Sequence, residues 1–151
     1  MLERNTPPEV LHYNAAMSRA RQLQDPKLAA TLFDELLKDR TLSPDVYSFS
    51  AAIRAADRDW RRALSLLDVM AREYGCTPDV VCFTAAVTAC SRAGQTAQAL
   101  ALYERMFVSK VEPNAFTYSA LVSACDKAGR AEDALRLVLT LVALTTCNHN
   151  N

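Results

Sequence analysis

An internal repeat of 34 to 36 residues is the feature that most restricts how this chain can fold. Each repeat carries a proline, then an acidic or amide residue, and then an aromatic residue five positions after the proline. Units of this size cannot bury their apolar faces alone, so they stack and share a core. The sequence therefore predicts a linear array of stacked units, marked by Pro8, Pro44, Pro78 and Pro113.

Two helices are predicted in each unit. The chain has three glycines in 151 residues, is rich in Ala and Leu, and lacks alternating β-branched runs, which favours helices over strands. In the third unit we expect one helix from about Val80 to Arg92 and a second from about Thr96 to Ser109. The residue after each proline is a suitable N-cap for a first helix, and Gly94 and Gly129 are suitable stops. The predicted fold is all-α, a right-handed α-solenoid of about four helix-turn-helix repeats.

The second unit differs from the others in its length. It has two residues fewer between its aromatic Phe49 and the Ala63 of its second helix, so its inter-helix turn must be tighter. Trp60 stands near this turn, where we expect it to cover the core, with a platform for stacking a base as the alternative. The predicted division of the chain is residues 1–9 as the tail of a preceding repeat or an N-terminal extension, then repeats at 10–45, 46–79, 80–114 and 115–151, the last with a divergent end.

Composition excludes several classes of function. Seventeen basic and seventeen acidic residues cancel, so a partner held by overall charge is not favoured and any anion site must be local. The sequence contains no metal-binding Cys/His spacing and no glycine-rich loop, and we predict no enzyme activity, no metal, no cofactor and no small-molecule substrate. The five cysteines are expected to be small apolar fillers in a reducing compartment.

The apolar runs of the chain and its first residues bear on membrane and targeting signals. The longest apolar stretch, 134–144, is too short for a membrane span and contains Arg136. The first ten residues lack both a signal core and a transit pattern, so either targeting is absent or the chain is an internal piece of a longer one. We expect no membrane association.

Two long segments carry a family resemblance. "VVCFTAAVTACSRAGQTAQALALYERMFVSKVEPN" and "AFTYSALVSACDKAGRAEDALRL" resemble P-type units of the pentatricopeptide repeat family. These units begin with an apolar pair and an x-aromatic-Asn/Ser/Thr motif, carry Lys/Arg-Ala-Gly at the turn, and end in Pro-Asp/Asn. The resemblance covers about residues 10 to 141, with Leu23-Gln24 replacing Ala-Gly in the first unit.

The resemblance implies sequence-specific binding of single-stranded RNA, about one base per repeat. It further implies a role in RNA processing, stability, editing or translation in a mitochondrion or chloroplast. A tetratricopeptide-like scaffold that binds a peptide or protein is the alternative, although none of the four units supplies its Trp, Leu-Gly and Tyr signature.

In the family, the polar residue after the aromatic and the last residue of the same unit contact one base together. Aspartate only accepts hydrogen bonds, which suits uracil or guanine, whereas asparagine also donates, which suits adenine or cytosine. A larger first residue leaves room for a pyrimidine and a smaller one for a purine. The RNA sequence that the resemblance implies is U, G and A.

The capping role of the second residue is the alternative, but it does not explain the small polar residue after each aromatic. The implied base-binding residues are Asn14 with Asp45, Ser50 with Asp79, Thr84 with Asn114, and Ser119 in the last unit.

Two further sets follow from the resemblance. An apolar residue near the start of each first helix would sandwich adjacent bases, with packing between repeats as the alternative; this set is Leu11, Tyr47, Val81 and Phe116. A basic residue at the end of each first helix would face phosphate, with a solvated helix C-terminus favoured by the helix dipole as the alternative. That set is Arg58, Arg92 and Lys127, while the first unit has Gln22.

The last predicted helix, "ALRLVLTLVALTT", has no polar face. A terminal solenoid helix normally has one, because nothing stacks on it. We therefore expect an exposed apolar patch that includes Leu139 and Val142, through which the chain self-associates or contacts further repeats.

Overall fold

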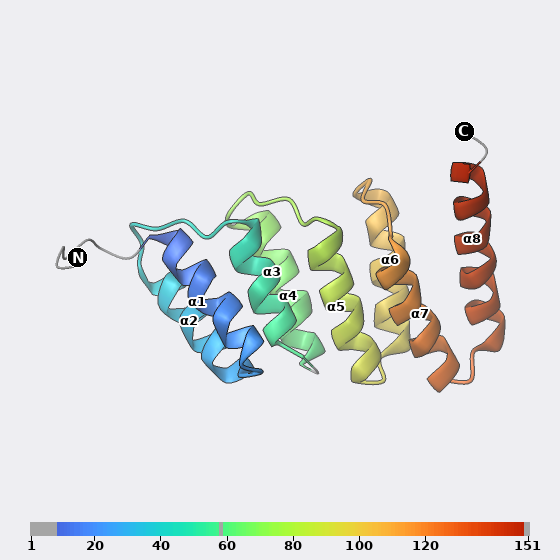
Figure 1. Cartoon of the computed structure of the whole chain (residues 1–151), viewed down its shortest axis with the longest axis horizontal. Helices are drawn as coiled ribbons and strands as arrows, with labels where there is room; N and C mark the ends of the chain where they lie inside the picture. The colour runs from blue at the N-terminus through green and yellow to red at the C-terminus, as the bar shows by residue number, and fades with distance from the viewer. Residues whose placement is uncertain (1–8, 58, 150–151) are drawn as a thin grey trace.

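The computed structural model describes residues 9–57 and 59–149, with side chains described as far as Cys147. Within these residues the chain forms eight helices and no strand, arranged one after another along the long axis of the molecule (Figure 1). This arrangement confirms the predicted all-α solenoid. No helix in the described part is long and apolar enough to cross a bilayer. The helices are α1 (Val10–Gln22), α2 (Pro26–Lys38), α3 (Val46–Ala55), α4 (Trp60–Arg72), α5 (Val80–Arg92), α6 (Thr96–Val108), α7 (Ala115–Lys127) and α8 (Ala131–His149).

The helices pack as four consecutive hairpins. Each odd-numbered helix packs against the even-numbered helix that follows it, and α1, α3, α5 and α7 also pack against one another in order. The even-numbered helices α2, α4 and α6 each contact the first helix of the next hairpin. The odd-numbered helices therefore form one continuous layer along the array.

Caps and turns define the helix ends as the sequence predicts. Asp45, Asp79 and Asn114 are N-caps whose side chains accept the backbone N–H three residues later, at 2.9, 3.0 and 3.0 Å. Gly94 and Gly129 follow the C-caps with φ of 76° and 72°, a conformation that costs glycine little. Each cap removes an unsatisfied donor, so the helix starts are encoded locally.

The short second unit shortens its first helix. Helix α3 has 10 residues where α1, α5 and α7 have 13. Trp60 is the first residue of α4 and lies half-buried against the core, as expected of a residue that covers it. Helix α3 ends at Ala55, and Arg58, which was predicted to stand at the end of this helix, lies outside the described residues.

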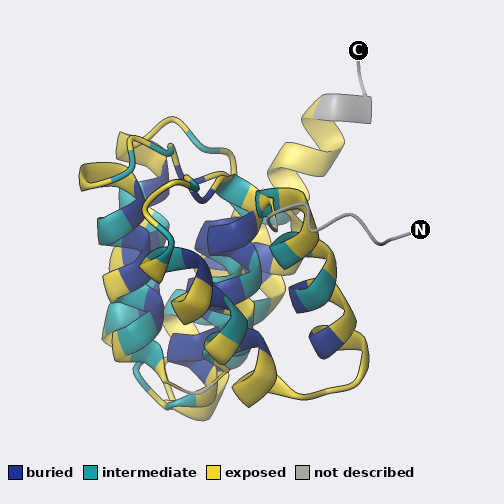
Figure 2. Ribbon diagram, turned by 90° about the vertical axis from the view of Figure 1, so that its left-hand side faces the viewer, coloured by how far each residue is buried: buried dark blue, intermediate teal, exposed yellow. Residues whose placement is uncertain are grey.

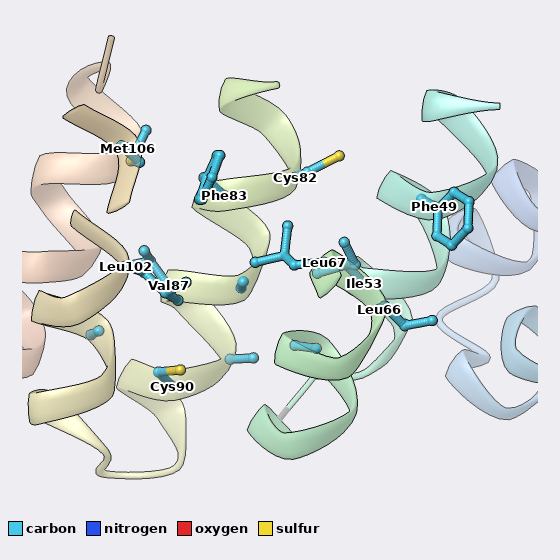
Figure 3. Packing of buried hydrophobic residues seen from close by; sticks show 14 of the residues in the cluster. Phe49, Ile53, Leu66, Leu67, Cys82, Phe83, Val87, Cys90, Leu102 and Met106 are labelled. Atoms are coloured by element: carbon cyan, nitrogen blue, oxygen red, sulfur yellow. The ribbon is translucent and has the colours of Figure 1, made fainter. Parts of the chain in front are cut away.

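A single core runs between the two helix layers (Figure 3). The repeated aromatic position supplies Phe49, Phe83 and Tyr118, all buried. Cys82 and Cys90 are buried fillers as predicted, and burial raises their pKa to about 12 and about 11, so both thiols stay protonated. Cys125 is buried as well, whereas Cys76 is half-buried and Cys147 is exposed.

Helix α8 packs on α7 through one face and leaves another open. Leu137 is buried against α7, but Leu135 and Leu139 are 59% and 58% exposed. The helix has 19 residues and α7 has 13, and the last turns of α8 stand clear of the array in Figures 1 and 2. Leu144, predicted on the same face as Leu137, is consequently exposed.

Candidate functional site

An open groove of about 760 Å³ runs over the layer of odd-numbered helices at α5 and α7. Its walls combine small polar and basic side chains with the aromatic Phe116, with Val81 and with several alanines. Many of the residues singled out from the sequence lie together here. They are Val81, Thr84, Arg92, Asn114, Phe116, Ser119 and Lys127.

Asn14 and Asp45, which are 31 residues apart, meet where α1 packs on α3. The Asn14 side-chain amide donates to Asp45 Oδ1 at 3.1 Å, and Ser48 Oγ donates to Asn14 Oδ1 at 2.7 Å. Partial burial raises the pKa of Asp45, but hydrogen bonds from Ser48 and Asn14 outweigh it and hold the pKa below its ordinary value. Asp45 is therefore ionised at neutral pH and can only accept.

Thr84 and Asn114 are connected through a third residue. Thr84 Oγ1 lies 2.7 Å from Thr117 Oγ1, which in turn donates to Asn114 Oδ1 at 3.0 Å. Thr117 is the third residue of α7 and is fully buried, while Thr84 is half-buried and Asn114 is exposed. These two contacts through Thr117 place Thr84 and Asn114 at the same edge of the groove.

Ser50 and Asp79 differ from the other two pairs. Ser50 Oγ donates to the Tyr47 carbonyl at 3.0 Å, and Asp79 accepts the Cys82 N–H as its cap. Among the described residues, no hydrogen bond joins Ser50 to Asp79. The structure therefore brings two of the three predicted pairs into hydrogen-bonded contact and leaves the middle pair unconnected.

Capping occupies only one of the two polar atoms at the end of these side chains. Asp45 and Asn114 each use Oδ1 for the cap, so Asp45 retains Oδ2, which has only a long 3.4 Å contact from Asn14. Asn114 retains its Nδ2, because reversing the amide would turn its nitrogen toward the Thr117 N–H. Asp45 thus keeps an acceptor where α1 meets α3, and Asn114 keeps a donor at the edge of the groove.

The apolar set near the helix starts is largely in solvent. Tyr47 and Phe116 are 77% and 78% exposed, and Leu11 is 71% exposed, whereas Val81 is half-buried. These three exposed side chains are therefore not buried between repeats. Large exposed aromatics on one helix layer are typical of a surface that contacts a ligand.

The predicted basic residues differ from one another in their surroundings. Lys127 lines the groove, but Arg92 is already paired with Asp57, with 2.6 Å between its Nη1 and Oδ1. Arg21 and Arg54 also line the groove and were missed, because the prediction assumed that all first helices end at the same position. Arg54 lies in the last turn of the short α3, and a search for basic residues in each last turn would have found it.

The comparisons with known proteins place these features in a family. The PPR repeat family model matches residues 78–127, and a PPR repeat model matches residues 116–142. Within residues 78–142 the chain therefore carries pentatricopeptide repeats. Both matches fall on the two units whose motifs are most complete. The search of curated proteins found no match.

Solved pentatricopeptide repeat structures share this fold. PPR10 in complex with an 18-nt psaJ RNA element is 28% identical, with a TM-score of 0.79 over 91% of this chain. A crystal structure of PPR10 from maize is 21% identical, with a TM-score of 0.77 over 94% of this chain. The PPR domain of Arabidopsis thaliana protein-only RNase P 1, in complex with tRNA, is 17% identical, with a TM-score of 0.73. The match covers 93% of this chain and 75% of that domain's chain. This chain spans about 20% of the length of PPR10.

Proposed function

We propose that this chain binds single-stranded RNA along the layer formed by α1, α3, α5 and α7. Each of the repeats at 10–45, 46–79, 80–114 and 115–151 takes about one base. The observation that carries the proposal is that polar pairs from adjacent repeats meet at the edge of this layer while aromatic residues beside them lie in solvent. The complex of the similar PPR10 with RNA supports it.

The first pair suits uracil. Asp45 offers a carboxylate oxygen to the ring N3–H, and the second amide hydrogen of Asn14 can donate to a uracil carbonyl. Cytosine presents an unprotonated N3 at the same place, so it would set a lone pair against the carboxylate. The pair therefore favours uracil over cytosine by the direction of its hydrogen bonds.

The second and third pairs suit guanine and adenine. Ser50 donates to the Tyr47 carbonyl, so its oxygen and Asp79 Oδ2 are two acceptors, matching the adjacent N1–H and N2–H₂ donors of guanine. Thr84 and Asn114 offer an acceptor and a donor, matching N6–H₂ and N1 of adenine. The expected order is U, G and A along RNA running 5′ to 3′.

Local charge, rather than net charge, would hold the RNA backbone. Lys127, Arg21 and Arg54 line the groove, and Arg92 stands beside them with its partner Asp57. Each phosphate contact makes binding weaker as salt rises. A protein with seventeen charges of each sign can therefore still bind RNA along one strip.

We further propose, from the likeness to pentatricopeptide repeat proteins, that this binding serves RNA processing, stability, editing or translation in a mitochondrion or chloroplast, with catalysis, if required, supplied by another domain or protein. Imaging of the tagged full-length gene product tests the location. Residence outside both organelles would refute this part of the proposal without touching RNA binding.

The RNA proposal is tested by fluorescence anisotropy with a labelled oligomer that contains U-G-A and with matched oligomers that change one base. Stacking is worth roughly 1 to 3 kcal/mol per base, and association is costly, so micromolar or weaker binding is expected. Changing Tyr47 and Phe116 to Ala should weaken RNA binding at least about fivefold. The control Val108→Ala, which removes an exposed side chain of α6, should leave RNA binding unchanged. Binding of extended peptides but not of RNA would refute the proposal.

A further inference from the structure

The buried hydroxyl of Thr117 connects the two groove residues of the third pair without being exposed itself. It accepts the Asn114 backbone N–H at 3.2 Å and donates to Asn114 Oδ1 at 3.0 Å. Its remaining neighbour is Thr84 Oγ1 at 2.7 Å. This inference rests on the proposed function and concerns the same site.

The number of hydrogens decides the direction of these bonds. A threonine hydroxyl has one hydrogen and two lone pairs, and the Thr117 hydrogen goes to Asn114 Oδ1, which can only accept. The short contact to Thr84 therefore needs the hydrogen of Thr84. The Thr84 oxygen is left with its lone pairs for a ligand, so it accepts and cannot donate.

The same helix position confirms that this arrangement is specific to certain repeats. In α3 it is Ser48, whose single hydroxyl hydrogen lies within reach of Asn14 Oδ1 at 2.7 Å and of Asp45 Oδ1 at 2.9 Å. In α5 it is Cys82, whose thiol is a weak donor, and there Ser50 is oriented instead by the Tyr47 carbonyl. The hydroxyl thus occurs where α1 meets α3 and where α5 meets α7, the two places where the residues of a pair are joined by hydrogen bonds.

We propose that Thr117 is a positioning residue for base recognition: it turns Thr84 into an obligatory acceptor and holds the donor end of Asn114 toward the groove. The pair then recognises the N6 amino group of adenine as well as its N1. Ser48 does the corresponding work for Asn14, whose amide nitrogen it keeps directed at Asp45.

Thr117 also completes the N-terminal cap of α7, so its removal lowers stability whatever it does for RNA. The test therefore compares bases rather than affinities. The probes are RNA oligomers with adenosine, guanosine or purine ribonucleoside at the third position, the last of which lacks the N6 amino group. The variants are Thr117→Val, which keeps the shape without the hydroxyl, Thr117→Ser as rescue, and Cys82→Ala as a control at the equivalent position of α5.

The unmodified chain should bind adenosine about fivefold more tightly than purine ribonucleoside, the value of one hydrogen bond. Thr117→Val should bring this ratio near one, Thr117→Ser should restore it, and Cys82→Ala should leave it unchanged. A ratio that survives Thr117→Val, alongside a normal preference for adenosine over guanosine, would overturn the inference and leave the proposed function intact. Absence of RNA binding or of any base preference in the unmodified chain would refute the proposed function and the inference with it.

Discussion

Replacing Asn114 by Asp exchanges one atom at the edge of the groove and little else. Asn114 Oδ1 accepts the Thr117 N–H and hydroxyl, both at 3.0 Å, and a carboxylate can make the same two bonds. The cap of α7 is therefore preserved. The end that faces the groove changes from an amide donor to a carboxylate acceptor.

The expected magnitude follows from this single reversal. The substitution turns the donor at this position into an acceptor. Opposite the N1 of adenine this change loses a hydrogen bond, and opposite the N1–H of guanine it gains one, with each change worth roughly 1 to 3 kcal/mol. The ratio of adenine to guanine binding should therefore fall at least about 25-fold and invert. Helix stability should not fall, because a carboxylate at a helix N-terminus contributes about 0.3 to 1 kcal/mol at low ionic strength.

The assay measures oligomers that carry each base at the third position, together with thermal unfolding followed by circular dichroism. The matched control is Asp45→Asn, which makes the opposite exchange and should move the first position from uracil toward cytosine. An equal loss of affinity for all four bases in Asn114→Asp would refute the reasoning, because it would mean that Asn114 only caps α7.

Three other predictions follow from the surface of the molecule. Leu139→Glu combined with Val142→Lys should keep helicity and shift the chain toward monomer. Sedimentation of the unmodified chain at about 100 μM is the check. If that chain is already monomeric, or if the double variant unfolds, the α8 face is not an association surface. Asp57→Asn should free Arg92 and raise RNA affinity about two- to fivefold at low salt. Stability should change by less than about 1 kcal/mol, because the ion pair is exposed. An unchanged RNA affinity would exclude Arg92 as a phosphate contact. At pH 8 a thiol reagent should modify the exposed Cys147 first, whereas the buried thiols, whose pKa burial raises, should react only on unfolding; simultaneous reaction of all five would contradict the packed core.

Local signals in the sequence determined the helices, because each depends on residues a few positions apart. The expected helix at Val80–Arg92 is α5, and the next was predicted within one residue of the observed end at Val108. Prolines, capping residues and Gly94 act through bonds within a single turn. The residues of the three base-binding pairs could likewise be named from the repeat, although their function is still a proposal.

Tertiary packing decided which side chains meet. Thr84 and Thr117 are 33 residues apart, and their 2.7 Å contact depends on how α5 and α7 are rotated against each other. The ion pair of Arg92 with Asp57 depends on α3, which is three residues shorter than α1, α5 and α7. Because α3 ends early, Arg54 lies in its last turn. Rotation and offset between stacked helices arise from the whole set of core contacts, so no local motif encodes them.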